Sequence, residues 1–352
     1  MSQVNQLHRT RDDVLEVGGA EKRTELLEWV AFHNPSAKGE ATYFVAEDAG
    51  AIVALQGRMP VEFAINGTRT RGYYAHDTYV HPDYRKKGLG FPLVASLAQA
   101  IEQRSDSFFC VLGGTPLNLK IQRRMGYREI SPVPQYVKVL DPYRQLCRFL
   151  RSPLLAKVLN PFALILLSLV DALLKCVNRT HLRTIPIERF DDRFDELMKS
   201  MIGRLGICSY KGSAYLNWKY VDRPFKKDTI FAVERDGCLA GFVVLAPSIR
   251  PSGNVGAIMD MIADPEDKQT IATLCQTAVD HFRKQNAQYI WCAMSDGRFV
   301  ELLRRFLFFR FGSGKAMLLG NIERFSLDNI SLTDISKWHI TLGESDTFML
   351  TL

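Results

Sequence analysis

Residues 80–90, with the sequence VHPDYRKKGLG, constrain the fold of this chain more than any other segment. The residues before them predict a strand, and residues 91–103 have a helical pattern. Gly88 and Gly90 carry no Cβ, so the main chain can approach an anion closely there. The N–H groups at the start of the following helix favour negative charge, because the helix dipole is positive at that end. This segment therefore predicts a loop that binds a diphosphate.

The charge of the chain agrees with an anionic ligand. Arg85, Lys86 and Lys87 lie in the loop itself, and the 352 residues carry a formal net charge of +7. A basic protein can bind nucleic acid, an acidic membrane surface or phosphorylated substrates. We expect no nucleic-acid partner, because the sequence lacks zinc-finger spacing, a helix-turn-helix pattern and a basic arm interleaved with aromatic residues.

The cysteine pattern bears on the compartment and on metals. The chain has seven cysteines, all isolated in the sequence, and no CxxC pair. We therefore expect no disulfide framework and no metal site, and a reducing compartment fits best. Residues 1–13 are polar and lack the apolar region of a signal peptide, so we expect a cytoplasmic protein.

Residues 161–177 (PFALILLSLVDALLKCV) form the most apolar stretch of the chain. The stretch is about one helical turn short of a comfortable membrane span, and it contains Asp171 and Lys175. Three interpretations stay open: a buried linker helix, a helix that lies on a membrane or contacts an acyl chain, and a transmembrane helix. The second draws support from flanking basic residues, namely Arg148, Arg151, Lys157 and Arg179.

The order of predicted elements gives the fold class. Alternation and turn signals predict strands at 42–47, 52–59, 61–65, 70–80, 107–112 and 135–140, with helices at 25–32 and 116–125. Later strands are expected at 229–234, 239–246, 256–263 and 288–294, with helices at 191–205, 266–286 and 298–306. This order predicts an α/β protein of the α+β kind, with mixed sheets. We divide the chain into domains at residues 1–142 and 184–352, joined by an apolar helical connector at 143–183.

The two predicted domains resemble each other. Asp77 and Pro82 align with Asp260 and Pro265, both 183 residues further on, and a long helix follows in each half. We interpret this as a tandem pair, although shared helix–strand patterning alone remains an alternative. Lys268, Ile271 and Thr273 stand in the second half where the first has Arg85, Gly88 and Gly90. Side chains at the two glycine positions obstruct a phosphate, so the second domain is expected to be degenerate.

The loop motif resembles that of a known superfamily. Arg85-Lys86-Lys87-Gly88-Leu89-Gly90 matches the pattern Arg/Gln-x-x-Gly-x-Gly/Ala, and Val80-His81-Pro82 precedes it. Both features are similar to the GCN5-related N-acetyltransferase (GNAT) superfamily, in its tandem-domain bacterial form. The resemblance implies an acyltransferase that moves an acetyl or longer acyl group from acyl-CoA to an amine by direct transfer in a ternary complex. The co-substrate would be acetyl-CoA or another acyl-CoA.

The resemblance also implies where the co-substrate binds. The main-chain amides of Lys86, Lys87, Gly88, Leu89 and Gly90 would hold the pyrophosphate, and Arg85 would face the phosphates. The pantetheine arm would lie between the strand ending at Val80 and the strand at 107–112. It would bond to the strand near Thr78 and Val80 and contact Asn118, because an amide can pair with an open strand edge. The family's general-acid tyrosine falls here on Gln122, which leaves Tyr127 and Tyr136 as substitutes.

Candidates for a general base lie on the strand before the loop, at His76, Asp77 and Tyr79. Strand alternation places Asp77 and Tyr79 on one face and His76 on the other. Because Asp77 recurs as Asp260 in the half that should not bind CoA, a structural role for it is the alternative. A water relay, or transfer without a base, also stays open.

The acceptor and two other functions remain open. The segment Leu216-Asn217-Trp218-Lys219-Tyr220 resembles bacterial members associated with surface-polysaccharide clusters, which implies an amino sugar among small-molecule amine acceptors. The missing tyrosine motivates a catalytically silent CoA-binding or regulatory protein. The apolar stretch at 161–177 motivates peripheral membrane contact, and with it a membrane-surface acyltransferase that uses a lipid-like substrate.

Overall fold

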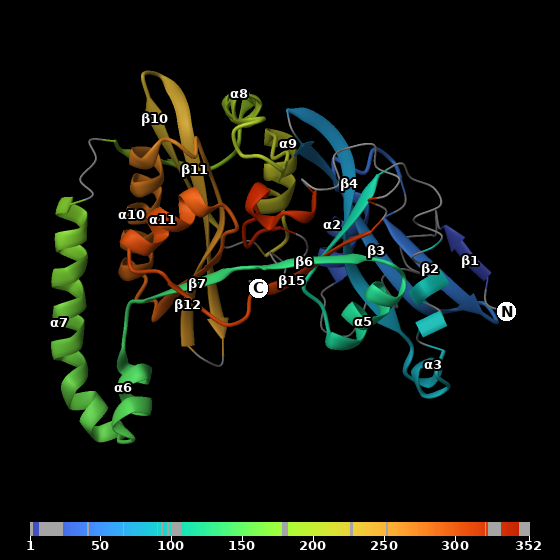
Figure 1. Cartoon of the computed structure of the whole chain (residues 1–352), viewed down its shortest axis with the longest axis horizontal. Helices are drawn as coiled ribbons and strands as arrows, with labels where there is room; N and C mark the ends of the chain where they lie inside the picture. The colour runs from blue at the N-terminus through green and yellow to red at the C-terminus, as the bar shows by residue number, and fades with distance from the viewer. Residues whose placement is uncertain are drawn as a thin grey trace.

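A computed structural model describes residues 3–6, 24–40, 42–65, 67–89, 91–92, 94–96, 99, 107–177, 182–225, 228–250, 253–320, 322 and 332–344. Gly90 and most of the helix predicted at 91–103 lie outside the described residues. Two mixed sheets form the body of the molecule, and Figure 1 shows them side by side. The predicted mixed α/β class is confirmed.

The first sheet has the strand order β1–β2–β3–β4–β5–β15–β6, and β9 pairs with β3. Its strands are β1 (Gln3–Gln6), β2 (Tyr43–Asp48), β3 (Ala51–Ile65), β4 (Thr68–Val80), β5 (Phe108–Leu112), β6 (Arg128–Val133), β9 (Cys208–Ser209) and β15 (Lys315–Gly320). The second sheet has the order β14–β7–β13–β12–β11–β10–β8. Its strands are β7 (Gln135–Val139), β8 (Thr184–Ile187), β10 (Thr229–Arg235), β11 (Cys238–Arg250), β12 (Gly253–Ala263), β13 (Tyr289–Ala293) and β14 (Phe309–Arg310).

The helices lie around these sheets. They are α2 (Thr24–Phe32), α3 (Pro82–Lys86), α5 (Pro116–Arg124), α6 (Tyr143–Leu150), α7 (Pro153–Val177), α8 (Asp192–Met201), α9 (Ser213–Leu216), α10 (Lys268–Lys284) and α11 (Gly297–Arg305). A π-helical turn, η1 (Asn217–Val221), continues α9, and a 3₁₀ turn, η3 (Ile335–Lys337), lies near the C-terminus. α3 and α5 lie at the end of the molecule opposite α7 (Figure 1).

β3 is a single strand where the sequence suggests two. It runs through Pro60, which pairs in register with Tyr73 of β4. The first residue of β2, Tyr43, pairs with Gly57 of β3. The residues of β3 after Gly57 therefore have no pairing partner in β2. Proline is tolerated where a strand edge needs no N–H donor. The expected break between 59 and 61 is therefore wrong.

The two sheets exchange strands. β7 follows the first sheet's β6 in sequence, yet it pairs with β13 and β14 of the second sheet. β15 comes from the far end of the chain and lies between β5 and β6 of the first sheet. The strand predicted at 135–140 therefore exists, but it belongs to the second sheet. Figure 1 shows β6 and β7 following one another from one sheet to the other.

This exchange gives a prediction about truncation. Residues 1–142 expressed alone would keep β7 without its partners and would leave β5 and β6 without β15. Because unpaired main-chain groups and the exposed core oppose folding, we expect this fragment to lack a cooperative unfolding transition. Circular dichroism during thermal unfolding measures this, with the full chain as control. A fragment that melts cooperatively would contradict the prediction.

The strand orders of the two sheets correspond position by position when the second sheet is read from β8 to β14. In each sheet a parallel pair lies at the same place, β4 with β5 in the first and β12 with β13 in the second. The first strand of each parallel pair also has a register shift against its other neighbour. The shift lies close to Asp77 where β4 pairs with β3, and close to Asp260 where β12 pairs with β11. These correspondences support the internal repeat that the sequence suggests.

A buried cluster of charged side chains lies between the two sheets. Lys211 forms ion pairs with Asp260 of β12 and with Glu344, whose Oε1 lies 2.8 Å from Lys211 Nζ. Lys219 Nζ lies 4.0 Å from Asp260 Oδ2, and all four side chains are buried. Ser209 of β9 donates to Glu344 Oε2 at 2.7 Å. The cluster thus joins a segment beside the first sheet to a strand of the second.

Electrostatics within the cluster keep the carboxylate of Asp260 ionised. Burial alone would raise the pKa of Asp260, but the ammonium groups of Lys211 and Lys219 lower it to about 2. Burial likewise opposes a charge on Lys211, yet Asp260 and Glu344 raise the pKa of its ammonium. Burial lowers the pKa of Lys219. Asp260 therefore has a structural role.

Candidate functional site

A cleft opens between β4 and β5. Among the described residues, these strands pair only at Gly72–Tyr74 of β4, and they diverge beyond that point. The cleft has a volume of about 460 Å³. Its lining includes Ala75, His76, Asp77, Thr78, Tyr79, Val80, Arg85, Val94, Val111, Leu112, Gly113, Gly114, Thr115, Leu117, Asn118 and Ile121. All three candidates for a general base and four of the predicted CoA contacts thus lie around one cavity.

The edge of β4 that faces this cleft is free of β5. On the other side of the strand, β3 pairs with Tyr79 and Val80, and the N–H of His81 donates to the carbonyl of Val53 at 2.8 Å. An extended ligand carrying amides can pair with such an edge as a further strand would. Thr78 and Val80 therefore lie where the sequence analysis expects the pantetheine arm.

The glycine at 88 has a local structural reason. α3 ends in a Schellman motif, in which the N–H of Gly88 donates to the Arg85 carbonyl and that of Leu89 to the Tyr84 carbonyl, both at 3.0 Å. Gly88 has a φ of +74°, and a Cβ built on it would meet nothing within 4 Å. The left-handed conformation by itself favours glycine here.

The same hydrogen bonds change the expected role of the loop amides. The N–H groups of Lys87, Gly88 and Leu89 all donate within the chain. A bound diphosphate would instead meet the positive charges of exposed side chains, chiefly Arg85, which lines the cleft. Lys86 and Lys87 are also exposed. Gly90, the last residue of the motif, lies outside the described residues.

His76 and Asp77 form a pair supported by Tyr43. Asp77 Oδ2 lies 2.9 Å from His76 Nδ1 and accepts a hydrogen bond from the Tyr43 hydroxyl at 2.7 Å. The imidazole lies flat against Gly57, where a Cβ would come within 2.4 Å of His76 Cε1. His76 Nε2 has no hydrogen-bond partner among the described residues. With Nδ1 engaged by the carboxylate, Nε2 is the nitrogen that remains to accept a proton.

A β-bulge brings this pair together. The β3–β4 register shifts between Leu55 and Gly57, and Asp77 has a φ of +47°. Aspartate tolerates this left-handed conformation better than most residues. The bulge interrupts the alternation of the strand, so Asp77 turns towards His76. The prediction that these two side chains occupy opposite faces is wrong.

The other candidate acids and bases are less well placed for proton transfer in the cleft. Tyr79 packs against the cluster around Leu55. Gln122 is fully buried, and it is not among the residues that line the cleft. Tyr127 packs on Gly320 of β15, and Tyr136 lies in the second sheet because β7 does. Among the described residues that line the cleft, His76 is the histidine, and its imidazole is the group that can act as a base.

Helix α5 closes the far side of the cleft. Thr115 caps it by accepting a hydrogen bond from the Asn118 N–H at 3.2 Å, and Pro116 occupies its first turn. Gly113 and Gly114 have φ values of +76° and +121°, which a strand-to-helix connection of this shape requires. Asn118 Oδ1 is buried and has no hydrogen-bond partner among the described residues. It therefore remains available to a ligand amide.

The corresponding place in the second half is closed. Helix α10 begins after Asp267, whose carboxylate accepts a hydrogen bond from the Thr270 N–H at 3.1 Å. Burial opposes its charge, but the hydrogen bonds from Thr270 lower the pKa of Asp267. Ile271 and Thr273, at the two glycine positions, are buried within α10. A carboxylate at this helix start repels a diphosphate, and the side chains fill the space.

The aromatic segment after α9 belongs to the core. Trp218 stacks on Trp29 with ring centroids 4.4 Å apart, and the Tyr220 hydroxyl donates to Asp260. Both are buried. They therefore offer no surface on which an acceptor sugar could stack.

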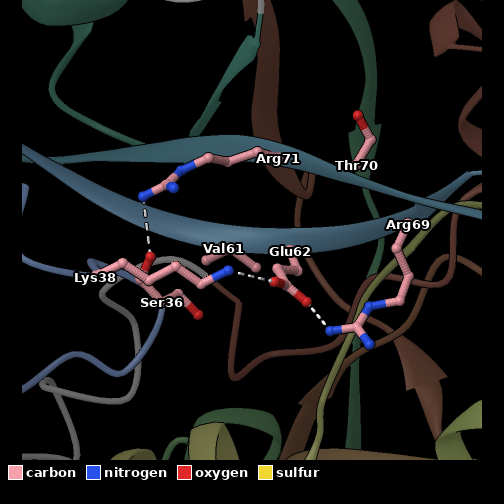
Figure 2. A pocket seen from close by; sticks show the side chains of 7 residues that line it. All are labelled: Ser36, Lys38, Val61, Glu62, Arg69, Thr70 and Arg71. Carbon is pink, nitrogen blue, oxygen red and sulfur yellow. Dashed lines mark hydrogen bonds and ion pairs between the residues drawn. The ribbon is translucent and has the colours of Figure 1, made fainter.

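A smaller pocket of about 120 Å³ lies over β3 and β4, away from the cleft (Figure 2). Glu62 accepts hydrogen bonds from Lys38 and Arg69, and Arg71 donates to the Ser36 carbonyl at 3.0 Å. Burial favours the neutral acid, but Arg69 and Lys38 lower the pKa of Glu62. The charges here satisfy one another, so this pocket is structural.

Tyr43 and Gly57 are the site residues that sequence reasoning missed. Tyr43 lies in the strand predicted at 42–47, and Gly57 lies in the one predicted at 52–59, where an isolated glycine signals close approach of another group. That signal names no partner. Among the described residues, no group of three or more metal-ligating side chains comes together.

Comparison with known families places the cleft within a recognised domain. Residues 12–130 match a family model described as an acetyltransferase (GNAT) domain. This range contains β4, α3 and α5, which surround the cleft. No curated protein sequence matches the chain.

Solved structures share the fold over most of the chain. A GCN5-related N-acetyltransferase from Anabaena variabilis has a TM-score of 0.61 at 11% identity, covering 91% of this chain and 72% of that one. A second, from Kribbella flavida, has a TM-score of 0.56 at 15% identity, covering 90% and 71%. The N-myristoyltransferase of Saccharomyces cerevisiae with bound myristoyl-CoA has a TM-score of 0.55 at 14% identity, covering 93% and 84%.

Proposed function

We propose that this chain, whose residues 12–130 match the GNAT acetyltransferase domain, transfers an acyl group from acyl-CoA to an amine within a ternary complex. The GNAT fold supports acyl transfer in general. The observation that carries the proposal is the cleft between β4 and β5, which places His76, Arg85 and Asn118 around one cavity. The second half, closed at Asp267, is proposed to be a decayed copy that supplies β7 and supports the fold.

In this proposal the cleft holds acyl-CoA along its length. Arg85, with Lys86 and Lys87 nearby, attracts the diphosphate through charge. The pantetheine amides pair with the open edge of β4 near Thr78 and Val80, and Asn118 Oδ1 accepts from an amide N–H. Two partly buried hydrogen-bond sites on opposite walls would hold the thioester in place, which lowers the entropic barrier to transfer.

The proposed base is His76. The amine nitrogen attacks the thioester carbonyl, a C–N bond forms as the C–S bond breaks, and coenzyme A leaves as the thiol after its thiolate takes up, through His76, the proton that the amine loses. His76 Nε2 accepts the proton lost by the amine, while Asp77 holds the imidazole through Nδ1. Tyr43 fixes Asp77 in turn.

Binding and turnover are tested separately. Titration calorimetry with CoA, acetyl-CoA and myristoyl-CoA measures binding and reports on acyl length. Release of free thiol measures transfer to a panel of small amines that includes amino sugars. Transfer to at least one amine supports the proposal. CoA binding without turnover by any acceptor would favour the silent CoA-binding alternative, and absence of binding would refute both.

Replacing Gly88 with valine is expected to weaken CoA binding about tenfold. Valine in the left-handed region costs roughly 1–2 kcal/mol, and the loop relieves this strain by breaking the motif that positions Arg85. Gly67→Val is the matched control, because Gly67 has a φ of +85° and open surroundings in a hairpin turn. Equal affinities of the two variants would contradict the proposed role of the loop.

A further inference from the structure

Helix α7 presents an apolar side to solvent. Within an 18-residue apolar segment of this helix, the buried share is 6%. The interpretation of the stretch as a buried linker helix is therefore wrong. Its exposed large side chains recur every three or four residues and form one stripe, named here the α7 stripe: Leu154, Leu155, Val158, Leu159, Phe162, Ile165, Leu166, Leu169 and Leu173. Phe149 of α6, the preceding helix, is a further large apolar side chain and is 85% exposed. Contiguous exposed apolar surface of this kind marks an interaction site.

Polar contacts hold the other side of α7 against the second sheet's layer. Asp171 accepts from Lys138 of β7 at 2.8 Å and pairs with Arg283 of α10. Lys175 donates to Asp280 of α10 at 2.9 Å. These contacts fix the rotation of the helix, so the α7 stripe faces outward, at the edge of the molecule where Figure 1 shows α7.

The topology excludes a single membrane crossing. α7 is long and apolar enough to cross a membrane by length and composition. However, β7 precedes α6 and α7, β8 follows them, and both strands belong to the second sheet. One crossing would place these strands on opposite sides of the bilayer. α6 spans about 12 Å at 1.5 Å per residue, too short to return across the membrane.

The charges beside the α7 stripe indicate its partner. Residues 143–170 contain Arg144, Arg148, Arg151 and Lys157 and no acidic residue. Basic residues beside an apolar helix face are typical of helices that lie in the interface of anionic membranes. We propose that α6 and α7 seat this protein on an anionic membrane surface, with α7 lying in the plane of the interface. A cytoplasmic protein would meet such a surface at the inner leaflet.

This contact is separate from the acyl-CoA cleft. α3 and α5, which border the cleft, lie at the opposite end of the molecule from α7 (Figure 1). The α7 stripe therefore anchors the protein and does not line the path of an acyl chain. The inference goes beyond the proposed transfer reaction and does not depend on it.

Flotation of the full chain with vesicles tests the proposal. We expect the protein to float with equimolar phosphatidylcholine–phosphatidylglycerol vesicles, and to float less with phosphatidylcholine alone. The double variant Phe162→Ser, Leu166→Ser should reduce partitioning at least about tenfold, because two large side chains no longer enter the bilayer. Arg148→Glu with Arg151→Glu should remove the preference for anionic lipid.

Controls separate this surface from others. Phe32→Ser changes an exposed phenylalanine of α2, at the other sheet, and should leave flotation unchanged. Thermal unfolding checks that each variant folds. A wild-type chain that floats with neither vesicle, or a double variant that floats like the wild type, overturns the proposal. Concentration-dependent dimerisation in light scattering that the double variant abolishes, without flotation, would assign the stripe to a second copy and overturn it too.

Discussion

Replacing Lys211 with methionine is expected to destabilise the protein by about 3–5 kcal/mol, because it leaves the buried carboxylates of Asp260 and Glu344 without their shared ammonium partner. The variant keeps a similar side-chain length and loses only the charge. Urea unfolding monitored by tryptophan fluorescence measures the change in the free energy of unfolding.

The dependence on pH follows from Asp260. Its pKa in the folded protein is about 2, below the ordinary value of 3.8. A lowered pKa stabilises the folded state fully above pH 3.8, and this contribution is lost as the pH falls through about 2. Acid unfolding of the wild type should therefore extend through this range. The difference between the wild type and Lys211→Met should shrink on acidification, because protonated carboxyls need no ammonium partner.

Two further variants make this prediction specific. Lys199→Met removes an exposed lysine paired with Glu196, and it should leave the free energy of unfolding close to that of the wild type, because solvent screens this pair. Lys211→Met combined with Glu344→Gln should recover part of the loss, because Lys219 and Asp260 then remain as a buried pair of opposite charge. If Lys211→Met alone is as stable as the wild type, the cluster does not join the two sheets.

Replacing His76 with glutamine is expected to lower kcat by about 10²–10⁴-fold while CoA affinity changes little. Glutamine fills a similar space beside Gly57 but cannot accept the amine proton. Steady-state kinetics with the best acceptor of the amine panel, together with CoA titration, measures both effects.

Both controls for His76→Gln should have milder effects on kcat. Asp77→Asn keeps a residue that tolerates a φ of +47°, and it should lower kcat less, since it disturbs only the orientation of the imidazole. His33→Gln, on an exposed histidine next to α2, should have no effect. If His76→Gln retains wild-type kcat, proton transfer does not pass through this imidazole, and the water relay becomes the better explanation.

Local patterns predicted the elements around the cleft well. The motif at residues 80–90 indicated a strand, a basic loop and a diphosphate ligand, and the loop and strand lie beside the cleft. The mixed sheet class followed from the order of strands and helices. Such features depend on neighbours in sequence, so they can be predicted without the tertiary structure.

Features that depend on distant residues could not be predicted in this way. The bulge at Asp77 leaves no trace in hydrophobic alternation, yet it decides that His76 and Asp77 meet. The sequence of residues 161–177 did not show whether the apolar side of this helix faces the core or solvent. The contacts of Asp171 with Lys138 and Arg283, together with that of Lys175 with Asp280, decided its orientation.

The sequence by itself determined the glycine-bearing loop and the chemistry of its basic side chains. The tertiary structure alone decided that the halves exchange β7 and β15, and that Asp260 belongs to a buried charged cluster. The physical reason is that strand pairing and charge pairing join residues far apart along the chain. Hydrogen-bonding groups on a strand edge accept any strand of suitable register, so the choice of partner depends on the packing of the whole molecule.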